Sequence, residues 1–231
     1  GGRIAAEQGD ARKAVELLRR AISEGDRSST TVLQLVQQLN QIGEFAAAEQ
    51  ELARLENWTD SVGQISMMSV GLSLAQGKNE SALERARSGI AVRPKDAGAY
   101  VVLAQAAAAI ARVDTEQSDE LHAEAEKALQ RAQQLTGGRD LSVWQAQFRY
   151  QSEVHGRSAG RAVLNALQQS ALPEGVRSLA LGNGYLSLGD WEEARNWLAK
   201  AKQAAPADLN VSLAQVALCR ATNDNEGLLL A

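Results

Sequence analysis

Few side chains in this sequence have the types and spacing that catalysis or metal binding requires. The 231 residues include two histidines, His122 and His155, and one cysteine, Cys219. A metal site, or a nucleophile with its base, needs several such groups close together. Glu124 and Glu126 lie near His122, but a spacing of two residues places side chains on different faces of a helix. We therefore expect His122 to be a surface residue.

The remaining chemistry-bearing residues also have structural interpretations. His155 precedes Gly156 at an expected helix end, where a cation complements the helix dipole. Cys219 ends an apolar stretch and is typical of a small buried hydrophobic residue. The Gly-Asn-Gly segment at 182–184 lies in a helical pattern with no strand before it, unlike a phosphate-binding loop. The sequence therefore predicts no catalytic residue, no metal site and no cofactor, and we expect the chain not to be an enzyme.

The composition favours helices over sheets. Hydrophobic residues make up 45% of the chain, mostly Ala and Leu, while aromatic residues make up only 4%. This mixture suits close helix packing better than a sheet, which is enriched in β-branched and aromatic residues. The lone cysteine is compatible with either the cytoplasm or the periplasm. The Ala- and Gln-rich character favours a bacterial source.

Charge and hydropathy argue against two kinds of partner. The net charge is −4, from 24 Lys and Arg against 28 Asp and Glu, and there is no basic block. Nucleic-acid binding requires clustered Lys and Arg that neutralise phosphates, so we expect no nucleic-acid partner. The sequence has no run of 18 apolar residues, and we expect no direct insertion into a membrane.

A glycine recurs at a fixed interval along the chain. Gly9, Gly43 and Gly77 are separated by 34 residues, and Gly189 lies three such periods plus ten residues after Gly77. The glycine suits the left-handed backbone of a turn between two helices. A small residue shortly after the turn lets the two helices approach closely, which predicts repeated helical hairpins. The residue five positions after each glycine is an alanine: Ala14, Ala48, Ala82 and Ala194.

The last copy of the repeat carries the most complete signature. It reads Leu181-Gly182-x-x-Tyr185, Gly189-Asp190, Ala194, Leu198, Ala201 and Pro206, with Ser178 where a Trp is common. On these residues the sequence resembles the tetratricopeptide repeat (TPR) family over essentially the whole chain. The resemblance implies an all-α fold, an α-solenoid in which antiparallel helix pairs stack into a right-handed superhelix. Pentatricopeptide repeats, which have a similar length and read RNA, need basic surfaces and are disfavoured.

We expect a single TPR-like solenoid over residues 1–231. The stretch 112–120 lengthens one hairpin and gives it an acidic tip, with Ser118 as the N-cap of the next helix. One pair fits least well, because Gly156 and Ala162 are six residues apart instead of five. Partial pairs at both ends indicate a piece of a longer repeat protein or an end covered by a partner. The expected pairs are 29–62, 63–96, 97–139, 140–174 and 175–208, with partial pairs at 1–28 and 209–231.

By the geometry of the resembling family, the first helix of each pair lines a concave wall. The residues expected on this wall are amide, small and apolar, without Lys or Arg, which disfavours the carboxylate clamp of some family members. Of the four tryptophans, only Trp144 is expected to contact a ligand, while Trp58, Trp191 and Trp197 are expected to pack. The predicted partner-binding residues are Leu33, Gln37, Asn40, Gln64, Met67, Gly71, Val101, Gln105, Trp144, Leu179, Asn183 and Leu186.

This wall predicts a non-catalytic scaffold or adaptor that binds a partner peptide or helix along the groove. Amide side chains bond to the backbone of a bound segment, and apolar side chains contribute through desolvation. An alternative is a structural repeat arm that positions a catalytic or membrane-anchored domain elsewhere in a longer chain. Self-association is left open.

Overall fold

The computed structural model describes residues 10–26, 28–56 and 62–224, which form α-helices joined by short turns and no strand. By its internal contacts the chain divides into two compact units, Gly1–Ala125 (unit 1) and Glu126–Ala231 (unit 2). The prediction of one continuous solenoid stays a prediction. The helices are α2 (Ala11–Ser23), α3 (Ser29–Gln41), α4 (Phe45–Glu56), α5 (Val62–Ala75), α6 (Asn79–Val92), α7 (Ala97–Ala111), α8 (Ser118–Thr136), α9 (Leu141–Val154), α10 (Arg157–Gln168), α11 (Glu174–Leu188), α12 (Trp191–Ala204) and α13 (Leu209–Thr222).

The repeated glycines form the turns between the paired helices, as predicted. Gly43, Gly77 and Gly189 have φ of 78°, 69° and 74°, the left-handed region in which a side chain is strained. Each turn closes with the same two backbone hydrogen bonds. At Gly189, its N–H donates to the Leu186 carbonyl at 3.1 Å and the next N–H donates to the Tyr185 carbonyl at 2.9 Å. This pattern satisfies carbonyls that the helix end would otherwise leave unpaired. Gly9 lies outside the described residues.

The alanines that follow the turns occupy the same position in each helix. Each is the fourth residue of its helix, in α2, α4, α6 and α12. Because a side chain larger than a methyl group would hold the partner helix away, this position sets the separation of the two helices. The prediction of a small buried residue here is confirmed, since all four are fully buried: Ala14, Ala48, Ala82 and Ala194.

The irregular pair α9 and α10 also has a small buried residue at the fourth position of its second helix, but its turn is shorter. Gly156 has φ of 84° and is directly followed by α10, whereas one residue separates Gly43 from α4. The fourth residue of α10 is therefore Gly160, which is buried, and a Cβ there would collide with Ser152. Ala162, which we expected at the contact, is exposed. The expectation was wrong because it counted from the glycine and not from the start of the helix.

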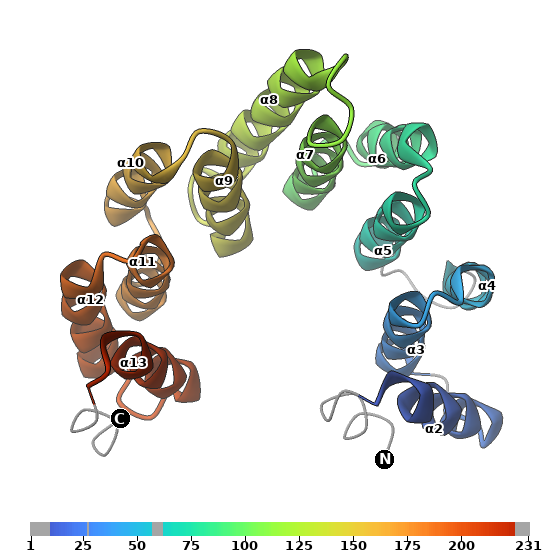
Figure 1. Cartoon of the computed structure of the whole chain (residues 1–231), viewed down its shortest axis with the longest axis horizontal. Helices are drawn as coiled ribbons and strands as arrows, with labels where there is room; N and C mark the ends of the chain where they lie inside the picture. The colour runs from blue at the N-terminus through green and yellow to red at the C-terminus, as the bar shows by residue number, and fades with distance from the viewer. Residues whose placement is uncertain (1–9, 27, 57–61, 225–231) are drawn as a thin grey trace. The chain divides into compact units, whose positions relative to one another are not determined.

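The helices of unit 1 that precede α8 form two layers. The helices α3, α5 and α7 form one layer and α4 and α6 the other, with α2 packed on α3 (Figure 1). Between the layers lies a core that includes Leu35, Leu39, Leu55 and Leu72, each at most 2% exposed. This arrangement leaves one side of α3, α5 and α7 free of the second layer.

At the tip of the long hairpin of α7 and α8, the residue expected to cap the second helix does not do so. Ser118 is the first residue of α8 and not its cap. Asp114 closes the connecting turn before this helix, because its Oδ1 accepts from the N–H groups of Glu116 at 3.1 Å and Gln117 at 3.2 Å. The first half of α8 is held to α6 by a bidentate ion pair, in which Arg87 of α6 donates to both Glu124 carboxylate oxygens at 2.8 Å.

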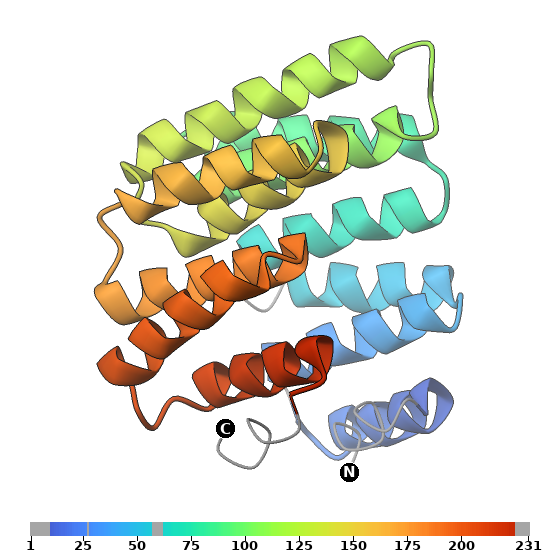
Figure 2. The same ribbon diagram turned by 60° about the vertical axis from the view of Figure 1, so that its left-hand side comes forward.

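Unit 2 stacks α9 to α13 in the same way. Figure 2 shows α11, α12 and α13 side by side, and each of these three helices contacts the other two. One buried carboxylate, Asp190 at the turn before α12, accepts hydrogen bonds from Arg157 and Arg161 of α10. A buried charge is stable only when it is paired, so these two arginines link α10 to the turn.

A close helix contact of unit 2 is at Gly182 of α11. A Cβ at this position would lie 2.5 Å from Leu198 Cδ2 and 2.7 Å from Leu198 Cγ of α12. Leu198 is itself 1% exposed and belongs to the core of unit 2. The glycine of the TPR signature is thus required here by sterics.

We predict that Gly182→Ala destabilises the protein by about 1–3 kcal/mol, because the added methyl overpacks the α11–α12 contact. Urea unfolding followed by circular dichroism measures the change. Gly175→Ala on the same helix is the matched control, since its Cβ would lie at an ordinary 3.5 Å from Ala204. Equal stability of the two variants would contradict the steric role of Gly182.

Candidate protein-binding surfaces

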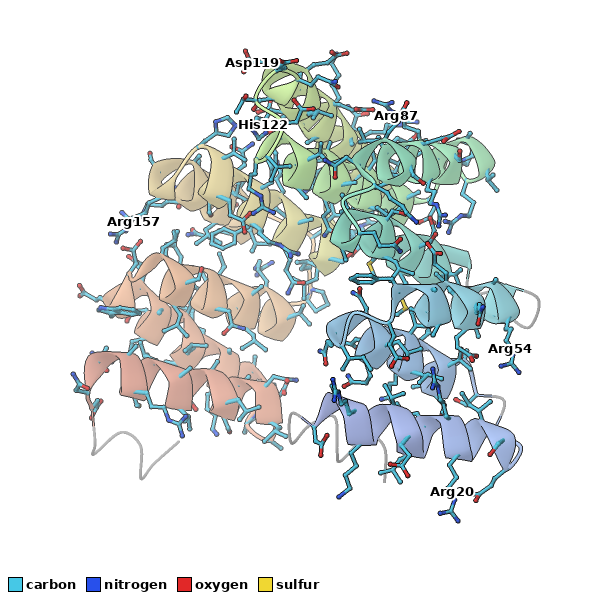
Figure 3. The ribbon with its side chains drawn as sticks, turned by 45° about the vertical axis from the view of Figure 1, so that its right-hand side comes forward. Arg20, Arg54, Arg87, Asp119, His122 and Arg157 are labelled. Carbon is cyan, nitrogen blue, oxygen red and sulfur yellow. The ribbon has the colours of Figure 1, made fainter. Side chains whose placement is uncertain are left out.

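Three helices of unit 1 share an uncharged exposed face. The sequences of α3, α5 and α7 contain no Asp, Glu, Lys, Arg or His at all. The ion pairs of unit 1 lie instead on the second helices and in the turns, for example Arg54 with Glu51 on α4 and Arg87 of α6 with Glu124 (Figure 3). The separation of charge follows the two layers of the unit. We call the free face of α3, α5 and α7 the neutral wall.

Equivalent positions of successive repeats form rows along this wall. Gln37, Gly71 and Gln105 are 34 residues apart, lie on α3, α5 and α7, and are all exposed. In the neighbouring row Met67 is 49% exposed, whereas Leu33 is partly buried and Val101 is only 9% exposed. The surface that a partner could touch is therefore centred on Met67, with a glutamine on either side.

Two other predicted residues of the neutral wall are less accessible. Asn40 is partly buried, and its Oδ1 atom has no hydrogen-bond partner in the described part of the protein. Gln64 lies in α5, but its side chain is outside the described residues. Their contribution to binding stays a prediction.

In unit 2 the predicted wall residues lie on α11 and α9. Asn183 is exposed, while Leu179 and Leu186 are half-buried and pack against the unit 2 core. The first helices of this unit carry charges, such as Arg149 on α9 and Arg177 on α11. The uncharged character of the wall is thus a property of unit 1.

Trp144 of α9 is held inside unit 2. Its ring is 8% exposed, and its indole N–H donates to the Gly138 carbonyl at 3.0 Å. Gly137 and Gly138, with φ of 56° and 75°, turn the chain after α8 and direct this carbonyl toward the ring. Trp144 packs in the interior and offers little surface to a ligand.

The structure also contains a feature that the sequence analysis missed. A cavity of about 810 Å³ lies between α8, α9 and the end of α10 in unit 2, with Trp144 and Leu129 in its lining. Its polar lining is dominated by glutamine side chains: Gln130, Gln133, Gln134, Gln147, Gln151 and Gln169. The signal that could have indicated it is the density of glutamine between residues 130 and 151.

Comparison with solved structures identifies a known type of fold. The thermophilic TPR protein TTC0263 of Thermus thermophilus is similar, with 27% identity, coverage of 85% of this chain and 100% of that one, and a TM-score of 0.54. The chain is a TPR-like helical repeat protein. A TPR protein of Parabacteroides merdae is similar at 15% identity, covering 94% and 95% of the two chains with a TM-score of 0.38. Neither a protein-family model nor a curated protein matches the sequence.

A further similar structure is a complex. Cut9, in the APC/C hetero-tetramer of Cut9 and Hcn1, has 14% identity, with coverage of 96% of this chain and 43% of that one and a TM-score of 0.46. The all-α repeat fold and the TPR-like character predicted from the sequence are confirmed. This fold indicates a protein-interaction scaffold.

Neither the two histidines nor the cysteine of the TPR-like chain is fully buried. His155 is exposed at the C-cap of α9, and its Nε2 lies 2.9 Å from the Glu126 carboxylate. His122 is partly exposed and Cys219 partly buried. Among the described residues no group of three or more His, Cys, Asp or Glu could hold a metal ion, and no helix is long and apolar enough to cross a membrane.

Tyr150 of α9 has a shifted ionisation. Burial and, as the second cause, the nearby Glu126 carboxylate raise the pKa of its phenol to about 12. Because the folded state holds this proton more tightly than the unfolded chain does, the neutral phenol favours folding below the ordinary tyrosine pKa of about 10. This contribution is lost as the pH rises through the folded-state pKa.

We predict that the free energy of unfolding falls between about pH 10 and pH 12 more steeply in the parent protein than in Tyr150→Phe. The phenylalanine variant keeps the buried ring and lacks the ionisable group. Its pH dependence therefore reports the titration of all other groups, and the difference from the parent reports Tyr150. Chemical unfolding at a series of pH values measures both curves. Parallel curves over this range would show that Tyr150 ionises as freely in the folded state as in the unfolded chain.

Proposed function

We propose that this TPR-like chain is a non-catalytic scaffold that binds a segment of a partner protein on the neutral wall of unit 1. The observation that supports the proposal most strongly is the complete lack of charged residues on α3, α5 and α7. Charged residues are nevertheless common on the second helices of the same unit, including α2 and α6. A surface without charge has a low cost of desolvation, which favours burial by a partner.

The side chains of the wall define the chemistry of the partner. Gln37 and Gln105 each carry a donor and an acceptor, so they pair with the backbone of an extended peptide or with the polar edge of a helix. Met67 is half-exposed and adapts its shape to an apolar side chain of the bound segment. Burial of that apolar area contributes about 25 cal/mol per Å². The bound segment therefore has apolar and uncharged polar residues on the side that faces the wall.

A charged C-terminus is not the expected ligand. A carboxylate is recognised by Lys, Arg or several convergent N–H groups, and the three wall helices supply no cation. The proposed ligand is an internal, uncharged stretch of a partner chain. This stretch contacts several repeats at once, and each contact is weak.

The triple variant Gln37→Lys, Met67→Lys and Gln105→Lys tests the proposal. A partner is first obtained by affinity purification with the parent chain, and its affinity is then measured by titration calorimetry. We predict that the variant binds at least about 100-fold more weakly, which corresponds to about 2.8 kcal/mol, because each lysine loses hydration when it is covered. Its helix content by circular dichroism stays unchanged, since all three positions point to solvent.

The matched control places the same three charges on the second layer of unit 1. Gln50→Lys, Ser88→Lys and Ala91→Lys lie at exposed positions of α4 and α6. This control keeps the parent affinity if the wall is the binding surface. Equal loss in both variants would point to a general effect of net charge, and equal retention would place the partner elsewhere.

A further inference from the structure

A small apolar pocket of unit 2 is a second candidate site. It lies between α9, α10 and α11, each of which contacts the other two, and its volume is about 140 Å³. It shares only Trp144 with the glutamine-lined cavity, and no charged residue lines it. Because all of its lining residues belong to unit 2, it is independent of the function proposed for unit 1.

The buried residues of the pocket are part of the packed core. Leu164 and Leu167 of α10 are 1% and 3% exposed and belong to the core of unit 2. A Cβ at Gly184 of α11 would collide with Leu164, so α10 and α11 are tightly packed at this place. The pocket is therefore formed before anything binds, which lowers the cost of ordering on binding.

Other residues of the lining can be reached from solvent. Leu141 and Phe148 of α9 and Ala180 of α11 are partly exposed, and each packs against the unit 2 core. Gln145 and Asn183 supply the amide groups of the lining, and both are exposed. A molecule that enters the pocket meets apolar side chains and amides. A charged group would lose hydration there without an opposite charge to replace it, so the occupant is uncharged.

The volume of the pocket limits the size of its occupant. Sites for whole small-molecule ligands usually measure about 300–1,000 Å³, and this pocket is smaller. An apolar cavity of about 150 Å³ holds a single benzene ring. The pocket therefore has room for one ring or one branched aliphatic group, which is the size of a single apolar side chain.

The combination of an apolar pocket with amides suits a polypeptide. Protein partners commonly bind through apolar anchors that fill pockets of this kind. Amide side chains complement the peptide group, because each has a C=O acceptor and N–H donors. We propose that the pocket binds one apolar side chain of a partner polypeptide, a phenylalanine or a leucine, and that Gln145 and Asn183 bond to the peptide groups next to this anchor.

Capped single amino acids test the pocket directly. N-acetyl-phenylalanine-N-methylamide and N-acetyl-leucine-N-methylamide are titrated into the ¹⁵N-labelled full chain, and N-acetyl-glycine-N-methylamide is the probe without an anchor. We expect the first two probes to shift the signals of the Trp144 indole and the Asn183 side-chain amide along one saturable curve. The glycine probe leaves both signals unchanged.

The variant Ala180→Leu fills the pocket from the α11 side. It binds the phenylalanine probe at least about tenfold more weakly, and its unfolding temperature is equal to that of the parent or higher, because apolar atoms fill a hollow. Ala162→Leu on α10 is the matched control, since Ala162 is exposed and does not line the pocket. This control keeps the parent affinity for the probe.

The variant Asn183→Ala tests the contact with the peptide group separately. Because Asn183 is exposed, its replacement leaves the fold intact even if the bulkier change at Ala180 does not. The phenylalanine probe binds at least about threefold more weakly, since a hydrogen bond is lost. Toluene, which has the ring but no amide, keeps its affinity. Unchanged affinity for the phenylalanine probe would contradict the contact with Asn183.

Three results would overturn the proposal as a whole. The first is that no probe shifts the pocket signals up to its limit of solubility. The second is equal affinity of the parent and Ala180→Leu for the phenylalanine probe, which would place the probe elsewhere. The third is saturable binding of toluene but of neither capped amino acid, which would assign the pocket to a free apolar molecule. Partner binding by the three-lysine variant of unit 1 affects none of these results, so the two proposals can fail separately.

Discussion

The whole arrangement depends on how closely two helices of one pair can approach. In the second helices α2, α4, α6, α10 and α12 the fourth residue is Ala14, Ala48, Ala82, Gly160 and Ala194, a methyl group or a hydrogen, whereas α8 has Leu121 at this position. A leucine follows four residues later in four of these five helices and fills the adjacent space, as Leu52 and Leu198 do. Because interiors are packed without voids, this pair of a small and a large residue fixes the separation of the helices. The exposed faces proposed to bind partners are positioned by this contact.

The sequence predicted this contact where the turn has its usual length and missed it where the turn is shorter. Counting five residues from Gly43 or Gly189 reaches the buried alanine, because one residue separates the glycine from the helix. Gly156 is itself the N-cap of α10, so the same count from it overshoots the contact. The physical rule concerns the position within the helix, and spacing along the chain follows it only when the turn is constant. Fold class was therefore predictable, and the exact register of the irregular pair was not.

The binding surfaces were predictable to a smaller extent, because exposure depends on neighbouring helices. Position counting placed Leu33, Met67 and Val101 in one row, yet Val101 is buried with most residues of the alanine-rich α7. Trp144 lies where a ligand contact was expected, but the carbonyl of Gly138 occupies its N–H. The direction of that carbonyl is set by two successive left-handed glycines, which the pattern of apolar residues does not specify. The cavity is formed by segments of three helices, and no local motif marks it.

The residues that stabilise the fold differ from those proposed for recognition, and this separation allows the two units to present different surfaces. Surface ion pairs such as Arg54 with Glu51 contribute at most about 1 kcal/mol each, so the charges of the second helices serve solubility more than folding. The folding energy comes mainly from buried apolar contacts, and these leave the exposed positions of the first helices free to vary. Unit 1 uses that freedom to present a surface without charge, and unit 2 surrounds a cavity with amides. A repeat protein can thus change its ligand by exchanging exposed side chains while each small residue at the helix contact remains in place.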